Sequence, residues 1–459
     1  MPNALTTITG AHPALGSLRP DPTPIGARPH RAALGLAIVG LLAGCGDDGG
    51  PSLDETDGDD AETTADTDTS AADTSADTSA DEGDSTTGDD GSGPIDGYPA
   101  LDAPCAFGVA EPATLAVSST DDATGAVGLV DVATKQIRRD LALAQSDIGL
   151  SAHGSHLFVI NRFGFDFVDV LDRDDDLALV SEFSVAIDED RSSNPHDLIV
   201  TENDEAYVSL FGDDQIQVFD LSDPGDPKPL RTVDLAAFAD ADGLPEMGKL
   251  VACGDVAFVA VERLDRDASW ASVDGTHLVP FALGSDRFYE WDAAHPGADE
   301  VDLLGLGAKA LRADPRETGG HVGLLLSSGL ERVDFAAGSS EWVISDAIFE
   351  AAGIGRYQLR DFDVGGDGNA YFAVATSDFS EHQIWRASLD GEGQDLEMVV
   401  SGLQTVTGSM EIVGDVLWFA DTTIGSSGLR VFDIGAATVV EVGTPISTGL
   451  PPYGLLALP

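Results

Sequence analysis

The stretch that decides the fold is residues 195–235, which read PHDLIVTENDEAYVSLFGDDQIQVFDLSDPGDPKPLRTVDL. It contains four short runs rich in β-branched and aromatic residues, and Asp, Asn, Gly or Pro separates each run from the next. Runs of this composition form strands, and those separators form turns. The stretch therefore predicts four consecutive strands joined by tight turns. The four runs are Pro195–Val200, Ala206–Leu210, Ile216–Leu221 and Leu230–Leu235.

The same order of runs recurs along the chain after about residue 148. First strands are predicted to begin near residues 148, 197, 249, 309, 361 and 410. This spacing is about 50 residues, with one longer unit of about 61, and four strands at such a period are typical of β-propeller blades. The sequence therefore predicts an all-β fold made of four-stranded blades.

The two ends of the repeat region complete each other. Residues 114–141 match the second, third and fourth strands of a blade that lacks its first strand, and residues 452–458 (PYGLLAL) match the first strand at Pro195. Pairing the last strand with the first blade removes an exposed sheet edge. We therefore expect a closed propeller of seven blades. The alternative, an open solenoid, would leave both ends uncapped.

The repeated units resemble the seven-bladed propellers of the YVTN and lactonase-like superfamily. Residues 216–235, with Asp220-Leu221-Ser222-Asp223-Pro224 and Pro227 inside them, are similar to the LVIVD repeat of bacterial surface proteins. The resemblance implies the fold over about 350 residues. Because propellers of this superfamily include lactonases, quinoprotein dehydrogenases and binding modules, the resemblance implies no single function.

The charge of the chain excludes several partners. The formal net charge is −58, from 81 acidic and 23 basic residues. Residues 46–98 hold 18 acidic residues and no basic one, and so polar a stretch cannot offset its ordering entropy by burying apolar surface. We expect a disordered tether there. The remainder keeps 62 acidic and 20 basic residues, so it would repel nucleic acids and anionic lipid headgroups.

The front of the chain indicates an exported, lipid-anchored protein. A basic cluster, Arg28–Arg31, precedes an apolar run at residues 32–42, which is too short to cross a bilayer and has the length of a signal-peptide core. The run ends in Leu42-Ala43-Gly44-Cys45, which resembles the lipobox of bacterial lipoproteins. The resemblance implies cleavage before Cys45 and acylation of that residue. A secretory signal with an incidental cysteine is the alternative.

These features divide the chain into three parts. Residues 1–44 are predicted to be a signal peptide with a long leader, residues 45–98 a lipidated and disordered tether, and residues 99–459 the propeller. Two acyl signals anchor a protein stably where one does not. We therefore expect a location in the cell envelope, on the exported side of the inner or outer membrane.

The two remaining cysteines, Cys105 and Cys253, are an even pair in an oxidising compartment. Cys253 falls in the turn after a first strand, which in a propeller lies on the bottom face, and Cys105 precedes the second strand of the closing blade. We expect a disulfide between them or, alternatively, two free buried thiols. A disulfide would attach the tether at the bottom and leave the top face, where the first strands begin, pointing away from the membrane.

The starts of the first strands predict a ring of side chains at the top of the central channel. Two of the four lysines of the chain fall in this ring, and converging cations can hold a carboxylate or a phosphate. In the alternative interpretation Lys249 and Lys309 only neutralise Asp197 and Asp361. The ring is predicted to contain His196, Asp197, Lys249, Lys309, Arg360, Asp361 and Tyr453.

Enzyme signatures are poor. The sequence has no P-loop, no Gly-x-Ser-x-Gly elbow and no His-Glu-x-x-His motif, so no catalytic residue and no catalytic metal ligand is assigned. A metal-dependent hydrolase of lactonase type, with Asp197 and Asp361 in the channel, is the alternative to a binding module. Lys249 and Lys309 beside these carboxylates would repel the ion.

Two Asp-rich loops have the alternation of calcium-binding loops, and both lack a Glu at the twelfth loop position. They are Asp172–Asp176 and Asp240–Gly243. No cofactor is predicted, and calcium is the one ion these loops suggest, although such runs are mostly solvated turns. The long fourth unit also contains Trp270, Phe288, Tyr289 and Trp291, either as an exposed contact surface or as packing.

The function that the sequence favours is a monomeric binding or protein-interaction module that acts through its top face. The partner is expected to be a protein or a small anionic ligand, and not a nucleic acid. The one membrane contact expected is the acyl anchor at Cys45.

Overall fold

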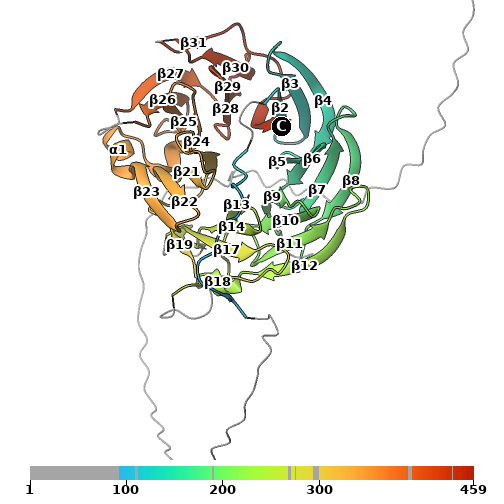
Figure 1. Ribbon diagram of the computed structural model, residues 1–459. Coiled ribbons are helices and arrows are strands. Elements are labelled where there is room, and N and C mark those ends of the chain that lie inside the picture. The colour runs from blue at the N-terminus through green and yellow to red at the C-terminus, as the bar shows by residue number, and fades with distance from the viewer. Residues whose placement is uncertain are drawn as a thin grey trace, which may run out of the picture. The chain divides into compact units, whose positions relative to one another are not determined.

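The computed structural model describes residues 93–108, 112–188, 191–266, 270–273, 275–292, 299–390, 395–436 and 438–458. The described part of the chain is a seven-bladed β-propeller of four-stranded antiparallel blades, as Figure 1 shows from along the axis. The predicted fold class and blade number are confirmed. The predicted signal peptide, Cys45 and the tether up to residue 92 lie outside the described residues.

The first three blades each run from the channel outward in the order first to fourth strand. Blade one consists of β32 (Pro452–Leu458), β2 (Thr114–Thr120), β3 (Gly125–Asp131) and β4 (Gln136–Ala144). Blade two consists of β5 (Ile148–His153), β6 (His156–Asn161), β7 (Phe167–Asp172) and β8 (Ala178–Ser184). Blade three consists of β9 (Pro195–Val200), β10 (Glu205–Leu210), β11 (Gln215–Asp220) and β12 (Lys228–Asp234).

Blades four to seven repeat this order. Blade four consists of β13 (Met247–Cys253), β14 (Val256–Val261), β17 (His277–Ala282) and β19 (Val301–Asp302). Blade five consists of β20 (Ala310–Ala313), β21 (Val322–Leu326), β22 (Leu330–Asp334) and β23 (Ser339–Ile344). Blade six consists of β24 (Leu359–Val364), β25 (Asn369–Ala375), β26 (His382–Ser388) and β27 (Glu397–Leu403). Blade seven consists of β28 (Met410–Val413), β29 (Val416–Asp421), β30 (Gly428–Asp433) and β31 (Val440–Glu441).

Short elements decorate this frame. The insertions of blade four contain β15 (Leu264–Asp265), which pairs with β16 (Ala271–Ser272), and β18 (Tyr289–Glu290), and these account for its extra length. β18 pairs with β1 (Ile95–Asp96), from the segment that precedes the first blade. The short helices are η1 (Ala236–Phe238), α1 (Asp346–Ala351) and η2 (Arg356–Gln358). In the part of the chain that the structure describes, no helix is long and apolar enough to span a bilayer.

The last strand closes the ring. β32 pairs antiparallel with β2, with Leu115 opposite Ala457 and Val117 opposite Leu455. The channel-side edge of β2 is therefore covered by a strand that comes from the opposite end of the chain. The closure predicted from the match between residues 452–458 and Pro195–Val200 is the one observed.

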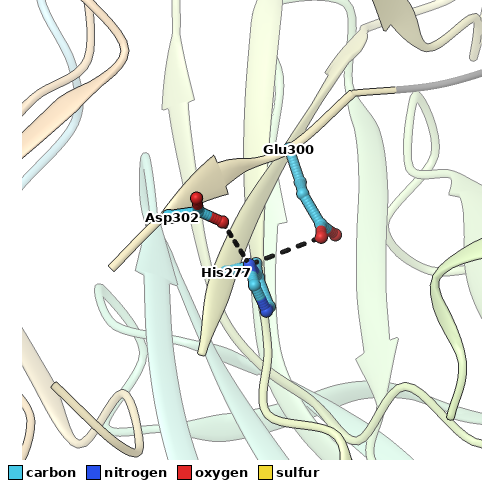
Figure 2. A group of neighbouring side chains, drawn as sticks. All are labelled: His277, Glu300 and Asp302. Atoms are coloured by element: carbon cyan, nitrogen blue, oxygen red, sulfur yellow. Dashed lines mark hydrogen bonds and ion pairs between the residues drawn. The ribbon is translucent and has the colours of Figure 1, made fainter. Parts of the chain in front are cut away.

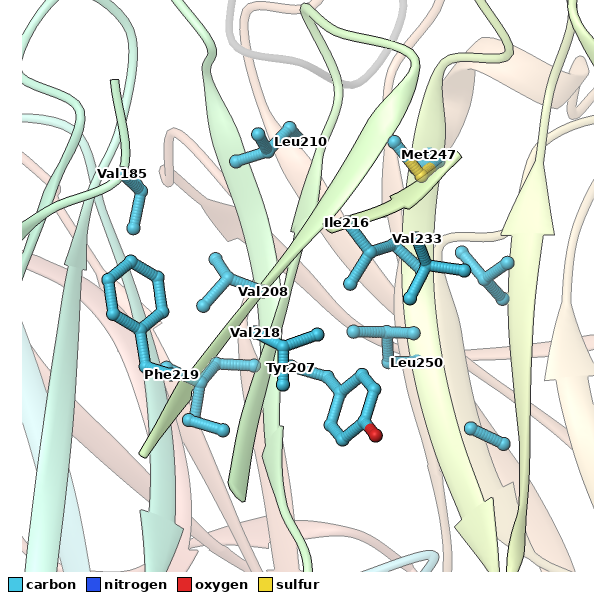
Figure 3. Close-up of a cluster of buried hydrophobic side chains, with 14 of the residues drawn as sticks. Val185, Tyr207, Val208, Leu210, Ile216, Val218, Phe219, Val233, Met247 and Leu250 are labelled. Carbon is cyan, nitrogen blue, oxygen red and sulfur yellow. The ribbon is translucent and has the colours of Figure 1, made fainter. Parts of the chain in front are cut away.

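The core lies between neighbouring blades. The second strand of each blade is apolar on both faces, as in β14, where every residue of Val256–Val261 is buried, because a blade packs on each side. Tyr207, Val208 and Phe219 of blade three pack with Leu250 of blade four in one such layer (Figure 3). Fourth strands are mostly exposed, as in β4. This pattern explains why second strands are the easiest to find in the sequence.

The inner strands of adjacent blades are joined by side chains and not by sheet pairing. Asp197 Oδ2 accepts a hydrogen bond of 3.1 Å from the backbone N–H of Leu250, and Ser409 Oγ accepts one of 2.9 Å from Leu455. Such bonds satisfy backbone donors that would otherwise face the channel unpaired. Polar residues on these strands therefore have a role in closing the ring.

The chain approaches the propeller from the bottom. Cys105 and Cys253 form a disulfide between positions 148 residues apart, and Cys253 is at the opposite end of β13 from Met247. Tyr98 Oη donates a hydrogen bond of 2.7 Å to the carbonyl of Phe335. The described chain begins at Gly93, so residues 93–98, which the sequence places in the tether, already pack on blades four and five.

Candidate functional site

A cavity of about 470 Å³ occupies the central channel at the end where the inner strands begin. Six of the seven residues of the predicted ring line it, and every blade contributes at least one residue to the wall. The seventh, Asp197, lies beside it, with Oδ2 4.0 Å from Lys249 Nζ. The six lining residues are His196, Lys249, Lys309, Arg360, Asp361 and Tyr453.

The cavity wall has more positive than negative side chains, although the chain as a whole has a net charge of −58. Of the residues that the structure describes, six basic side chains and three acidic ones line it. The starts of the first strands predict only three of these six basic residues, because the positions of the other three depend on loops and on the tilt of the inner strands. The basic residues are Arg162, Lys249, Lys309, Arg312, Arg356 and Arg360, and the acidic ones are Glu262, Asp361 and Glu411.

Lys249 has a more exposed side chain than Arg162 and Arg312, which also line the cavity. Its side chain is 42% exposed, and the carboxylate of Asp197 at 4.0 Å is at the outer limit of an ion pair. Asp197 is otherwise occupied, since Oδ1 accepts the N–H of Leu198 and Oδ2 accepts that of Leu250. A pair this long and exposed contributes little to stability. The ammonium group is thus placed to meet a second anion.

Lys309, which was expected to neutralise Asp361, contacts backbone carbonyl groups. Its Nζ donates to the backbone carbonyls of Arg356 and Leu359, the latter at 2.9 Å. It therefore holds the end of η2 against the cavity. The ion pair expected between Lys249 and Asp197 is observed.

Arg312 takes the place expected for Lys309. Its guanidinium lies 3.5 Å from Asp361, 3.7 Å from Asp363 and 3.7 Å from Glu411. Burial by itself would lower the pKa of Arg312, and these three carboxylates together raise it. Residues from blades five, six and seven thus share one half-buried cation.

Burial has the larger effect on the three carboxylates. It raises the pKa of Glu411 to about 8, against the opposing attraction of Arg312. Burial also raises the pKa of Asp361 and of Asp363. Asp361 and Asp363 accept backbone hydrogen bonds from Met410 and Ile412 of blade seven. Asp361 and Asp363 therefore connect blade six to blade seven, and the positive charge beside them is the guanidinium of Arg312.

This arrangement disfavours the hydrolase alternative. A channel metal would need Asp361 with further carboxylates converging on open space, and Arg312 lies where such an ion would bind. A fixed guanidinium repels a divalent cation. Asp197, the other carboxylate expected to bind metal, is committed to Lys249 and to backbone N–H groups.

Tyr453 belongs to a hydrogen-bonded triad on the opposite wall. Its hydroxyl donates to Asp147 at 3.0 Å and accepts from Arg162 at 3.1 Å, and Arg162 also pairs with Asp147. Burial is the main cause that raises the pKa of Tyr453 to about 12. The phenol therefore stays protonated at neutral pH. The strand starts place Asp147 and Tyr453 at the rim, and Arg162 is the member of this triad that they do not predict.

Aromatic side chains extend from the cavity to the top face. His196 stacks on Phe211 with ring centroids 4.4 Å apart, and Phe211 stacks with Trp270 at 6.4 Å. Burial, followed by the charges of Arg162 and Lys249, lowers the pKa of His196 well below its usual value. The imidazole is neutral, so it is not one of the cations that the sequence predicted to converge. It is an aromatic wall residue.

Arg360 is held close to the neighbouring blade. A glycine is required at position 408, because the backbone φ there is +74° and a Cβ would lie 2.4 Å from Cβ of Arg360. The guanidinium lies over the ring of Phe379, 5.4 Å from its centroid. Arg356 likewise lies over Tyr357, at 4.5 Å. Flat cationic and aromatic groups therefore border the cavity on the side of blade six.

Exposed apolar side chains gather on the same face. Second strands end at the top, so the loops to third strands and the connections between blades both lie there. Among the described residues, nine of the fifteen large apolar side chains that are exposed lie in these loops, and the other six lie on or just after outer strands. We call the nine the apolar rim. They are Phe163, Phe165, Ile187, Trp270, Val273, Leu304, Phe379, Val406 and Ile424.

The aromatic residues of the long fourth unit divide between the two expected roles. Phe288 packs against Phe238 at 5.1 Å and Trp291 against Tyr98 at 4.9 Å, while Tyr289 is half-buried in the pair with β1. Trp270 is 42% exposed and lines the cavity. Packing therefore accounts for three of them, and Trp270 belongs to the top face.

Two groups of side chains outside the channel have the composition of metal sites. In one, shown in Figure 2, His277 Nδ1 lies 3.0 Å from Asp302 and 3.4 Å from Glu300. Glu300 is also paired with Arg263, and the Asp302 side chain is 86% exposed. Because Glu300 is paired with Arg263 and Asp302 is exposed to solvent, we interpret this group as a histidine held by its hydrogen bond to Asp302. The other group consists of Asp240, Asp242 and Glu246.

The Asp-rich loop at residues 172–176 is an exposed turn. Asp172 Oδ1 accepts the backbone N–H of Asp174, and Asp176 pairs with Arg138 of the neighbouring blade. Its carboxylates are used in turn formation and in a surface ion pair. Of the two loops with calcium-like alternation, only the one at Asp240 gathers carboxylates.

The comparisons with known proteins agree with the fold. No protein-family model matches the sequence, and no curated protein is significantly similar to it. A protein of Lactobacillus plantarum superposes with a TM-score of 0.52 at 12% identity, covering 76% of this chain and 100% of its own. The periplasmic gluconolactonase of Pseudomonas aeruginosa superposes with a TM-score of 0.50 at 15% identity, covering 75% and 99%.

A virginiamycin B lyase from Staphylococcus aureus is a more distant likeness, with a TM-score of 0.41 at 10% identity, covering 67% of this chain and 87% of its own. At such identities these likenesses show the fold alone. The chain is thus a β-propeller.

Proposed function

We propose that this propeller is a binding module whose top face docks a partner that places an anionic group, a carboxylate or a phosphate, in the central cavity. One observation carries the proposal: among the described residues, six basic side chains and three acidic ones line the cavity of a chain with a net charge of −58. Basic residues are scarce in this protein, so their concentration in one cavity indicates a use.

The local chemistry supports an anion. Lys249 offers an ammonium group that is 42% exposed, and Arg356 lines the cavity with its guanidinium over Tyr357. Guanidinium and ammonium groups bind carboxylates and phosphates through charge-assisted hydrogen bonds. An anion there would also lie away from the acidic outer surface, which would otherwise repel it.

The apolar rim supports a partner larger than the anion alone. Exposed large apolar side chains around one concave site are typical of binding surfaces. Phe163, at 70% exposed, and Ile424, at 94%, stand on loops of blades two and seven. A partner that covers these side chains would gain apolar burial while its anionic group enters the cavity.

We further propose that the protein is a monomeric envelope lipoprotein with a propeller of the YVTN or LVIVD-repeat type. The lipobox-like Leu42-Ala43-Gly44-Cys45 supports acylation at Cys45, and the 18 acidic residues of 46–98 support an extended tether. Because residues 93–108 attach at the bottom, a tether from there would present the top face away from the membrane. The location would be the periplasm or the cell surface.

The test is a thermal-unfolding titration of the full chain with acetate, succinate, citrate and inorganic phosphate. We expect at least one anion to raise the Tm, since a ligand at a hundred times its Kd stabilises by about 2.7 kcal/mol. The Lys249→Gln variant should lose that shift. The matched control is Lys228→Gln, which removes an exposed lysine paired with Asp226 on the outer strand of blade three.

The control should keep the shift of the wild-type protein. An equal loss in both lysine variants would mean that the anion acts through general charge, which contradicts the proposed cavity site. Absence of any shift with all four anions would contradict binding of a free small anion. In that case the proposal would survive only if a protein partner were captured and Lys249→Gln released it.

A further inference from the structure

A loop on the top face brings three carboxylates together. Residues 235–246 connect β12 of blade three to β13 of blade four, and they contain Asp240, Asp242 and Glu246. One carboxylate oxygen from each lies within 4.8 Å of the others. Glu246 was not part of the predicted loop, because it follows Asp240 by six residues and the pattern sought a glutamate at the twelfth position.

The backbone of the loop aims these oxygens. Asp240 Oδ1 accepts the N–H of Asp242, and Asp242 Oδ1 accepts that of Leu244, both at 3.0 Å. Gly243 closes the turn at a φ of +86°, a left-handed conformation that suits glycine. Each aspartate therefore accepts a hydrogen bond of the turn through Oδ1, and its Oδ2 takes no part in the turn.

Two of the remaining oxygens are buried and lack a hydrogen bond. They are Oδ2 of Asp240 and Oε1 of Glu246. The Glu246 side chain is 0% exposed, and only its Oε2 is bonded, to the N–H of Leu264 at 3.0 Å. A buried carboxylate oxygen without a hydrogen-bond donor is costly. An unbonded oxygen of a fully buried side chain therefore points to a missing partner.

One side-chain cation approaches the group without satisfying it. Arg266 Nε lies 3.3 Å from Glu246 Oε1 and 3.8 Å from Asp242 Oδ2, yet this buried nitrogen makes no hydrogen bond. When all three carboxylates are ionised, one guanidinium leaves two negative charges unbalanced.

We propose that Asp240, Asp242 and Glu246 form a Ca²⁺ site on the top face, where the ion displaces Arg266 from the carboxylates. The ligands are all oxygens, which excludes a preference for zinc. Oxygens bound to one Ca²⁺ at 2.3–2.6 Å can be up to about 5 Å apart, whereas Mg²⁺ holds a tighter octahedron and keeps its waters. Water and backbone carbonyls would complete the coordination.

The site lies beside the cavity. Arg266 lies over Trp270, with its guanidinium carbon 5.0 Å from the ring centroid, and Trp270 lines the cavity. Displacement of Arg266 by the ion would remove this contact from one side of the indole. The environment of Trp270, and with it one wall of the cavity, would then depend on Ca²⁺.

The test uses the purified full chain after treatment with a chelator. We expect Ca²⁺ to raise the Tm by at least ~2 °C, and Tb³⁺ to give luminescence sensitised by tryptophan that Ca²⁺ abolishes by competition. The sensitised signal separates this site from weak binding along the acidic residues 46–98, which contain no tryptophan.

Asp242→Asn should weaken Ca²⁺ binding roughly tenfold or more, because the affinity of such sites follows the number of charged ligands. Glu246→Gln should also weaken Ca²⁺ binding. If this variant of a buried residue fails to fold, Asp242→Asn alone tests the proposal. The matched control is Asp174→Asn in the exposed Asp-rich loop, which should bind like the wild-type protein.

Arg266→Gln distinguishes an ion site from a purely structural ion pair. Removal of the competing guanidinium should tighten Ca²⁺ binding and enlarge the Ca²⁺-dependent rise in Tm. The proposal is overturned if Ca²⁺ leaves the Tm unchanged, if Asp242→Asn binds as tightly as the wild-type protein, or if Arg266→Gln weakens binding.

Discussion

Arg312 of blade five lies 3.7 Å from Glu411 of blade seven, across the channel wall that blade six supplies. The same guanidinium reaches Asp361 and Asp363 of blade six. The three blades are therefore coupled through one half-buried cation, in addition to the apolar layers between them. Removing one partner of such a group leaves charges buried and uncompensated.

We predict that Arg312→Met destabilises the protein by about 3–5 kcal/mol. The loss should be larger at pH 8 than at pH 5. Burial raises the pKa of Glu411 above its unfolded value, so protonation of Glu411 stabilises the folded state at low pH. This stabilisation is lost as pH rises toward about 8. Urea unfolding at the two pH values measures this.

The double variant Arg312→Met with Glu411→Gln is the control for that prediction. It removes one of the uncompensated charges, so it should recover part of the lost free energy of unfolding. A single variant as stable as the wild-type protein at both pH values would show that the carboxylates do not depend on Arg312.

His382 should make the protein sensitive to acid. Its side chain is 3% exposed, and neither ring nitrogen has a hydrogen bond. Burial, followed by the charge of Arg360, lowers its pKa to about 4. The pKa of His382 is lower in the folded than in the unfolded state. Its contribution to the free energy of unfolding is therefore fully present above about pH 6.5 and is lost as pH falls toward 4.

The measurement is the fall in Tm between pH 7.5 and pH 5. His382→Gln should reduce this fall, and it should not abolish it, because the pKa of His196 is lowered in the same direction. His153→Gln, at an exposed position, is the control and should leave the fall unchanged. An identical fall in all three proteins would contradict this account of His382.

The disulfide should stabilise the bottom of the propeller. Replacing Cys105 by Ser and Cys253 by Ala is expected to cost about 2–5 kcal/mol, since the bond closes a long loop in the unfolded chain. Residues 93–108 should also become sensitive to proteases. Urea unfolding and limited proteolysis measure the two effects, and treatment of the wild-type protein with a reducing agent should reproduce both.

Removal of the closing strand should affect the whole ring. A chain that ends at Leu450 lacks β32, so β2 keeps an unpaired edge facing the channel. We expect loss of cooperative thermal unfolding and formation of soluble oligomers in size-exclusion chromatography. A chain that lacks only Pro459 is the control. A cooperative, monomeric protein without β32 would mean that closure contributes little.

Much of the fold could be predicted because blade strands follow local rules. The second strands are apolar on both faces and the turns contain Gly, Asp or Pro, so the repeat is visible without any contact information. The predicted strand starts near 148, 197 and 410 agree with the observed Ile148, Pro195 and Met410 to within two residues. The same alignment placed six of seven ring residues at the cavity.

The partners of those residues could not be predicted in the same way. The sequence placed Lys309 next to Asp361, but Lys309 binds the carbonyls of Arg356 and Leu359, and Arg312 approaches Asp361 instead. The offset of three positions from Lys309 to Arg312 decides which side chain reaches the neighbouring blade, and a repeat alignment does not measure that offset. Glu246 was missed because it converges with Asp240 only through the left-handed turn at Gly243.

The sequence by itself determined the blade count, the strand order and the closure at Pro452–Leu458, because each depends on a local pattern that recurs or is complemented at the other end of the chain. The tertiary structure alone decided which charges meet. The pairing of Arg312 with Glu411 and the gathering of Asp240, Asp242 and Glu246 depend on blade tilt and loop path. Electrostatic energy depends on distances of a few ångströms between residues that the sequence places far apart.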